Sequence, residues 1–250
     1  MDPLQPVADF FNTLINTMAA FFQAIGLNSM LSISGVVFAI GTAIFFMEIL
    51  GFTFTKRGIG RNWIRWDSTD IAMTAMLSAI YGGGLAATAG IVLIPGFTWV
   101  RPADALNPMY GTVFGVPGAV AAAVGNLIGD ILSGTLSVGS IGGLMGQFFQ
   151  AYVPYKMVRK QIDIAMKTRR GFVVYEIATF LGAIVVGIYI SFFLDVLKIL
   201  PSDVVWYGFA PFVIVPSGVL GLIIAPPIQK IVYPKVKAWG LFYQDRQVQH

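Results

Sequence analysis

The chain has 250 residues and a net charge of +4; 56% of its residues are hydrophobic and only 11% are charged. A soluble domain carries about 25% charged residues, so this composition excludes an ordinary soluble domain and indicates an integral membrane protein. Apolar stretches of roughly 17–25 residues without strict alternation favour spanning helices over a barrel. Because Cys is absent, disulfides and thiolate chemistry are excluded. Because the single His is His250, the last residue, imidazole chemistry within the membrane is excluded as well. We expect neither a cofactor nor a nickel, cobalt or zinc site.

The first 60 residues predict an N-terminal extension. Residues 4–25 are apolar but interrupted by polar side chains at spacings that leave a polar stripe, which is typical of an amphipathic helix at the membrane surface. A full span over these residues stays open. Residues 30–54 form a long apolar run and predict one transmembrane span.

Residues 61–250 predict the core of the protein. A break at Gly115-Val116-Pro117 separates two of its apolar segments. Ser68, Thr69 and Asp70 are N-cap candidates for the first core helix. The six expected spans are 71–90, 105–115, 117–134, 138–155, 171–194 and 205–229. The predicted fold class is therefore all-α: a polytopic membrane protein with a six-helix core, one extra N-terminal span and an N-terminal amphipathic helix.

The Lys and Arg residues cluster in three segments between the predicted spans and after the last one. Segments 56–65, 156–170 and 230–246 together hold 14 of the 16 Lys and Arg residues. Cytoplasmic loops carry an excess of these residues, and six core spans place all three segments on one side. The sequence therefore predicts a multi-pass protein of the cell membrane with a cytoplasmic C-terminal tail.

Small residues recur every fourth position along two of the core spans. Such ridges let helix backbones approach closely where lipid removes the hydrophobic drive for association. Packing within the bundle is the simplest explanation for most of them. The ridges consist of Ala75, Ala79, Gly83 and Ala87 in the first core span and of Ala121, Gly125 and Gly129 in the third.

A group of polar residues marks the centre of the chain. Asn126 and Asp130 are four residues apart and share a helix face. Gln147 and Gln150 lie on the neighbouring span. Polar side chains at bilayer depth are costly and often functional. With Trp99, Arg101 and Asp104 in the loop above, they predict an outward-facing cavity for a small, polar, partly flat ligand.

Other roles stay open for the same residues. Asp130 would also serve as a helix cap, and Gln147 with Gln150 would also bond neighbouring helices. Arg101 and Asp104 would also form an exposed ion pair of little energetic value. The polar side chains at the outer ends of the last two spans are interpreted as interface anchors, with a place in the wall of the site as the alternative, and these are Tyr189, Asp195 and Trp206.

Motifs of enzyme chemistry are missing from the sequence. It contains no HExxH, no GxSxG and no GxxxxGK[ST] phosphate loop. We therefore expect no catalytic activity, and any ATP that drives this protein must bind to another subunit.

The central run resembles a known family. Residues 101–134, RPADALNPMYGTVFGVPGAVAAAVGNLIGDILSG, and residues 139–157, GSIGGLMGQFFQAYVPYKM, resemble the substrate-specific S components of energy-coupling factor (ECF) vitamin transporters. The resemblance covers roughly residues 70–230 and is most specific in the central run. It implies a six-helix membrane fold that binds a vitamin or related micronutrient near the outer face. Residues 1–60 depart from the family pattern, because they add one span and an amphipathic helix before the core.

The resemblance also implies partners and site residues. The family docks on a transmembrane coupling subunit driven by two ATPase subunits, and an AxxxA pattern in its first core span contacts that subunit. Ala75 and Ala79 match the pattern, and Gly83 continues the ridge. The ligand contacts that the family implies here are Trp99, Arg101, Asp104, Asn126, Asp130, Gln147 and Gln150.

The sequence thus favours a ligand-binding subunit of an ATP-driven importer. One alternative is a structural or assembly subunit of a larger membrane complex without its own ligand. A second is a solitary carrier or channel, which the position of the polar groups in the outer half of the bundle disfavours.

Overall fold

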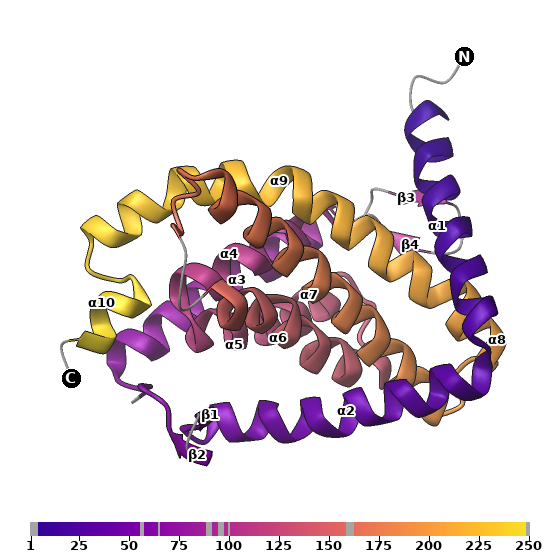
Figure 1. Ribbon diagram of the computed structural model, residues 1–250, viewed down its shortest axis with the longest axis horizontal. Helices are drawn as coiled ribbons and strands as arrows, with labels where there is room; N and C mark the ends of the chain where they lie inside the picture. The colour runs from indigo at the N-terminus through magenta and orange to yellow at the C-terminus, as the bar shows by residue number, and fades with distance from the viewer. Residues whose placement is uncertain are drawn as a thin grey trace.

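The computed structural model describes residues 5–55, 58–64, 66–88, 92–94, 98–99, 101–158 and 163–248. It confirms an all-α, polytopic membrane fold (Figure 1). The helices are α1 (Gln5–Ile25), α2 (Leu27–Ile49), α3 (Ser68–Thr88), η1 (Pro102–Ala105), α4 (Leu106–Phe114), α5 (Val116–Leu132), α6 (Gly139–Val158), α7 (Arg169–Val196), α8 (Ser202–Val204), a π-helical turn η2 (Val205–Phe209), α9 (Ala210–Ala238) and α10 (Tyr243–Val248).

Each expected core span corresponds to an observed helix, namely α3, α4, α5, α6, α7 and the α8–α9 segment. Within the described residues, four helical segments are long and apolar enough to cross a membrane: Leu27–Ile49, Ser68–Thr88, Arg169–Val196 and Ser202–Arg246. α4 has only nine residues, so it rises about 14 Å and does not span a hydrocarbon core of about 30 Å.

The break between α4 and α5 lies at Gly115, as expected. Its φ of 69° is a left-handed conformation that favours glycine. A Cβ there would also lie 3.1 Å from the Trp63 ring. Pro117 sits in the first turn of α5, where its missing N–H costs nothing.

Several boundaries differ from the prediction. α2 ends at Ile49, and the chain then forms an antiparallel hairpin of β1 (Phe52–Thr55) and β2 (Gly58–Arg61), where a continued span and a basic loop were expected. A second short hairpin, β3 (Val92–Ile94) and β4 (Thr98–Trp99), lies in the expected loop. The N-cap of α3 is Asp67, one residue before the expected candidates Ser68, Thr69 and Asp70. The Oδ1 of Asp67 accepts the backbone N–H of Asp70 at 2.8 Å.

The small-residue ridge of α5 packs inside the bundle. A Cβ added at Gly125 would lie 2.7 Å from Tyr81 Cδ1 on α3, and one added at Gly129 would lie 2.7 Å from Leu85 Cδ1. α6 covers the other side of α5 and packs in turn on α7. The glycines therefore allow the helices to approach closely, as the ridge predicted.

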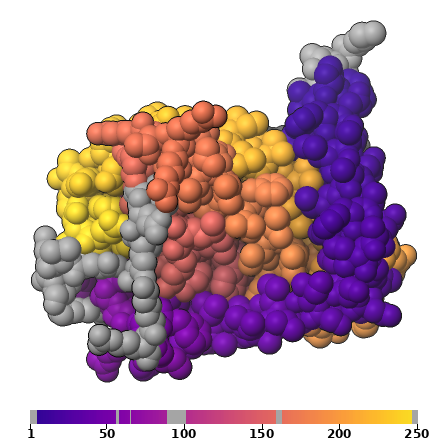
Figure 2. Space-filling view, viewed as in Figure 1, coloured from indigo at the N-terminus to yellow at the C-terminus, as the bar shows by residue number. Residues whose placement is uncertain are grey.

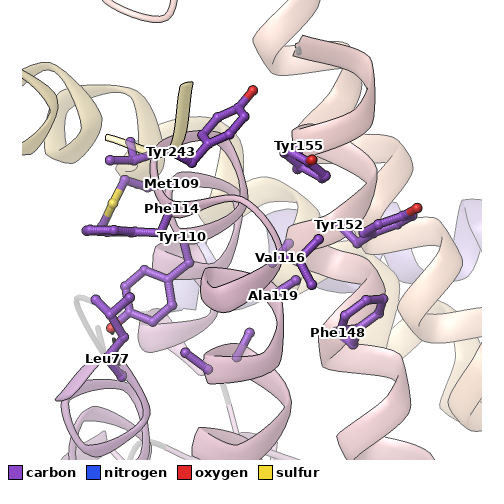
Figure 3. Packing of buried hydrophobic residues seen from close by; sticks show 14 of the residues in the cluster. Leu77, Met109, Tyr110, Phe114, Val116, Ala119, Phe148, Tyr152, Tyr155 and Tyr243 are labelled. Carbon is purple, nitrogen blue, oxygen red and sulfur yellow. Dashed lines mark hydrogen bonds between the residues drawn. The ribbon is translucent and has the colours of Figure 1, made fainter. Parts of the chain in front are cut away.

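The aromatic core fills one end of the bundle (Figure 3). Tyr243 of α10 packs edge-on against Tyr155, with ring centroids 5.1 Å apart. Arg246 of the same helix pairs with Asp70 at the start of α3. The C-terminal helix thus closes the end of the bundle where α3 and α5 begin and α6 ends.

The N-terminal extension lies outside the core. α1 packs on α9 and η2, and α2 packs on α7. Figure 2 shows the two helices, indigo to purple, along the right and lower margins of the molecule. The division of the chain at residue 60 stays a prediction.

Candidate functional site

A cavity of about 270 Å³ opens at the end of the bundle opposite the aromatic core. It lies between η1, the last turns of α5, the first turns of α6, the end of α7 and the start of α9. Polar and apolar side chains share its wall. The lining residues are Arg101, Asp104, Asn126, Asp130, Thr135, Ser137, Gly139, Ser140, Gly143, Gln147, Ile190, Leu194, Phe209, Phe212, Val213, Pro216 and Ser217.

Arg101 joins the two polar residues of α5. Its Nη1 donates to Asn126 Oδ1 at 2.9 Å and its Nη2 donates to Asp130 Oδ1 at 3.1 Å. Asn126 Nδ2 lies 3.3 Å from Asp130 Oδ2 and closes the triangle. Such charge-assisted bonds are stronger than neutral ones. The alternative of an exposed Arg101–Asp104 ion pair is not what the structure has, because the guanidinium reaches across to Asp130 of α5 instead.

Asp104 is buried on the other side of the cavity, with 2% of its surface exposed. The Tyr81 hydroxyl donates to its Oδ1 at 2.7 Å, and the Ser217 hydroxyl donates to its Oδ2 at 2.9 Å. A carboxylate has about four acceptor positions, so Asp104 keeps acceptor capacity toward the cavity that it lines.

Asn107 of α4 connects this carboxylate to α6. Its Nδ2 lies 2.8 Å from the Oε1 atoms of both Gln147 and Gln150 and 3.2 Å from the Tyr81 oxygen. Polar contacts of 3.2 Å or less therefore connect Asp104 through Tyr81 and Asn107 to the two glutamines, and the two hydrogens of Asn107 Nδ2 are shared among three acceptors.

Five of the seven predicted ligand residues line the cavity: Arg101, Asp104, Asn126, Asp130 and Gln147. Gln150 does not line it and instead accepts the hydrogen bond from Asn107. Trp99 belongs to β4, and its side chain lies outside the described residues.

The side chains interpreted as interface anchors are buried within the protein. Trp206 Nε1 donates to Asp195 Oδ2 at 2.8 Å, and the Tyr189 hydroxyl bonds Thr42 of α2. None of them lines the cavity. The three residues in question are Tyr189, Asp195 and Trp206.

Sequence reasoning missed Tyr81, Asn107 and Ser217. The signal for Asn107 was present, since it interrupts the apolar segment 105–115 just as Asn126 interrupts its own segment. Tyr81 and Ser217 carry no such signal, because hydroxyl groups are common in membrane helices and only the fold brings them to Asp104.

The outer face of α3 is apolar, and no other described part of the chain covers it. Ala75 and Ala79 are exposed, and no described atom lies within 4 Å of a Cβ built on Gly83. Met76 and Ile80 on the same helix are 52% and 53% exposed. Small residues here leave a shallow strip along the helix.

A second polar cluster lies at the opposite end of the molecule. Glu48 of α2 is 1% exposed. Its Oε1 accepts from the Thr53 and Tyr152 hydroxyls, both at 2.6 Å, and pairs with Lys156 Nζ at 2.7 Å. Asn62 Nδ2 lies 3.2 Å from its Oε2. This cluster ties α2 and the β1–β2 hairpin to α6.

The comparisons with known proteins leave one finding. No curated protein and no solved structure matches the chain. A family model described as QueT transporter matches residues 71–233, more than half of the chain. This confirms the resemblance to the S components of ECF-type transporters. The chain belongs to the QueT transporter family.

Proposed function

We propose that this chain is the substrate-binding subunit of an ATP-driven ECF-type importer and captures a small micronutrient at the outer membrane face. The observation that carries the proposal is the cavity of about 270 Å³ with the Arg101–Asn126–Asp130 network in its wall. Ligand sites are typically apolar hollows with a few oriented polar groups. The volume fits a compact ligand.

The family narrows the ligand class. QueT is an S component for a queuosine precursor, and we propose a precursor of this kind as the ligand here. The cavity offers a cation, two carboxylates and amides between aliphatic and aromatic side chains. A flat ligand with hydrogen-bonding edges complements such a wall.

The charge distribution supports an outward-facing site. Among the described residues, Lys156 at the end of α6, Arg169 at the start of α7 and Lys235 at the end of α9 lie at helix ends remote from the cavity. Because basic residues favour the cytoplasmic side, the cavity would face outward and the C-terminus would be cytoplasmic.

The exposed strip of α3 is the proposed docking face for the transmembrane coupling subunit. Ala75, Ala79 and Gly83 would let a partner helix approach closely. Two ATPase subunits would then drive reorientation of the loaded chain, so that the cavity opens inward.

Ligand binding is tested by calorimetric titration of a queuosine precursor into the purified chain. We expect saturable binding that is lost in Asp130→Ala. Asp203→Ala removes an exposed carboxylate that does not line the cavity, so it serves as the matched control and is expected to bind normally. A wild-type chain that binds no precursor would contradict the proposal.

Docking is tested by co-purification with the coupling and ATPase subunits. Ala79→Trp is expected to abolish co-purification and to leave ligand binding intact. Ile177→Trp, at a half-exposed position of α7, is the control and is expected to have no effect. Stoichiometric co-purification with membrane subunits other than these would instead favour an assembly role.

A further inference from the structure

The N-terminal extension lies outside the part of the chain that matches the family. The family model begins at residue 71, whereas α1 and α2 end at Ile25 and Ile49. The family match therefore assigns no role to these two helices. Their contacts with the core indicate what they do.

Contacts with α7 fix the position of α2. Phe38 stacks on Tyr189 of α7, with ring centroids 4.5 Å apart. A Cβ built on Gly41 would lie 3.0 Å from the same tyrosine ring, so the missing side chain lets α2 approach α7 closely. The chain turns sharply at Gly26, whose φ of 82° favours glycine, and α1 runs from this corner in a different direction from α2 (Figure 1). The position of α2 thus determines where α1 meets the core.

The corner between α1 and α2 packs on the π-helical turn η2. Phe22 of α1 and Met30 of α2 are 6% and 4% exposed and belong to one cluster of buried apolar residues. Trp206 of η2, which is fully buried, lies in the same cluster. The other buried members are Leu194, Val205, Ala210 and Ile214. The extension therefore covers one side of η2.

The same turn forms part of the cavity wall. Phe209, the last residue of η2, lines the cavity, and Leu194 both lines the cavity and belongs to the apolar cluster. No described residue of α1 or α2 lines the cavity. η2 thus meets the extension through the cluster of Trp206 and meets the cavity through Phe209.

Two sets of contacts support the turn. π-Helical turns are rare and are frequent at functional sites. From the end of α7, Asp195 accepts hydrogen bonds from Trp206 Nε1 at 2.8 Å and from Ser202 Oγ at 2.7 Å. From the extension, Phe22 and Met30 supply apolar packing. We expect the loss of one support to loosen η2 before it unfolds the bundle.

We propose that the N-terminal extension is a brace that holds η2 against the cavity and slows the release of the bound ligand. Phe22 is a positioning residue, because it belongs to the cluster of Trp206 and Leu194 and does not line the cavity. Loss of its ring raises the fraction of molecules in which the wall is open. Changes of this kind act mostly on the dissociation rate. This inference rests on the proposed function, because it concerns retention of the same ligand.

Three phenylalanine variants of the extension test the brace. A tritium-labelled queuosine precursor is bound to each purified chain, and its release is followed after a chase with unlabelled precursor. Phe22→Ala leaves a cavity against η2 and is expected to release the label at least about five-fold faster than wild type. The controls are Phe21→Ala, at a 62% exposed neighbouring position, and Phe45→Ala, at a 7% exposed position packed on Phe148. Both controls are expected to stay within about two-fold of wild type.

Phe45→Ala separates the brace from general stability. Phe22→Ala and Phe45→Ala each remove a buried ring of the extension, and both are expected to lower the free energy of unfolding. Equal acceleration of release in the two variants would overturn the inference. Gel filtration in detergent reports whether each variant is folded. If Phe22→Ala does not fold, Phe22→Leu takes its place, with release expected to be at least about two-fold faster than wild type, and a wild-type rate would overturn the inference.

Hydrogen exchange tests the brace without a ligand. The backbone amides of Val205–Phe209 are expected to exchange at least about five-fold faster in Phe22→Ala than in wild type, whereas those of Leu106–Phe114 should not change. Unchanged exchange at η2 would overturn the inference. If the wild type retains the precursor and folded Phe22→Ala releases it at the wild-type rate, the inference fails while the proposed function stands. A wild type that retains no precursor would contradict both.

Discussion

The two polar clusters of this protein use similar residues and differ in what they leave unpaired. Around Glu48, two hydroxyls, an amide and an ammonium group converge on one buried carboxylate. Around the cavity, Arg101, Asp104 and Gln147 also form hydrogen bonds but keep capacity toward an open space. We therefore propose the cavity cluster, and not the Glu48 cluster, as the binding site, because its unused hydrogen-bonding groups meet free volume.

The two clusters are expected to contribute to different properties of the protein, one to stability and the other to ligand affinity. The Glu48 cluster joins the N-terminal extension to α6 and should contribute to stability alone. The cavity cluster should determine ligand affinity, with less effect on folding. Changes in the two clusters are expected to affect different measurements.

The largest effect is expected from Lys156→Met. This change leaves the Glu48 carboxylate, 2% exposed at its side chain, without its cation. Breaking a buried pair in this way costs about 3 kcal/mol or more. The free energy of unfolding in detergent is expected to fall by about this amount, and ligand affinity in the folded fraction should stay within a few-fold. Glu48→Gln in the same chain should recover part of the loss, and a further fall would contradict the pairing.

Arg101→Lys is expected to act on binding instead. Lys keeps the charge but cannot bond Asn126 and Asp130 with two planar donors. Loss of one charge-assisted hydrogen bond corresponds to about 1.5–3 kcal/mol, or roughly ten- to hundred-fold in affinity. Titration measures this loss, and thermal unfolding of the same sample should change much less than in Lys156→Met. A larger loss of thermal stability in Arg101→Lys than in Lys156→Met would contradict the difference between the two clusters.

The spans were predictable because hydropathy and glycine breaks act locally. Leu27–Ile49 and Arg169–Val196 follow from their apolar length, and the break at Gly115 follows from Gly and Pro. The β1–β2 hairpin was missed because its aromatic and threonine residues continue the apolar run of α2 before the basic segment.

The site was predictable only in part, for a physical reason. Asn126, Asp130 and Gln147 stand out because each is polar within an apolar helix. Their partners depend on tertiary contacts. Arg101 lies three residues from Asp104 in sequence but bonds α5, and Ser217 meets Asp104 across 113 positions. No local pattern specifies such pairs.

A smaller change of cavity shape is expected from Gly143→Ala. A Cβ at Gly143 would lie 2.8 Å from Asn126 Nδ2, so the amide in the cavity wall must shift. We expect about a five- to ten-fold loss of ligand affinity with little change in unfolding. Gly208→Ala is the control, since its Cβ would meet open space. Unchanged affinity in Gly143→Ala would indicate that Asn126 does not shape the site.

The smallest effect is expected at Asp67, which lies outside both clusters and has a side chain 43% exposed. The Asp70 N–H lowers the pKa of this carboxyl, and Arg246 acts in the same direction. The contribution of the ionised Asp67 carboxylate to folding stability is therefore present above its unfolded-state pKa of about 3.9. It is lost as pH falls through its lower folded-state pKa.

Asp67→Asn keeps the helix cap and removes the charge. Its free energy of unfolding should fall by less than about 1 kcal/mol near neutral pH. The difference from wild type should begin to shrink as pH falls below about 4 and should vanish only below the lower folded pKa. A difference that grows on acidification would contradict this sign.

The central claim is that the cavity holds a small guest. It is tested most directly by mass spectrometry of the small molecules that heat releases from the chain, purified from cells supplied with a queuosine precursor. We predict close to one precursor per wild-type chain and almost none from Asp130→Ala. A wild-type chain that releases no small molecule and binds none of the precursor on titration would contradict the account.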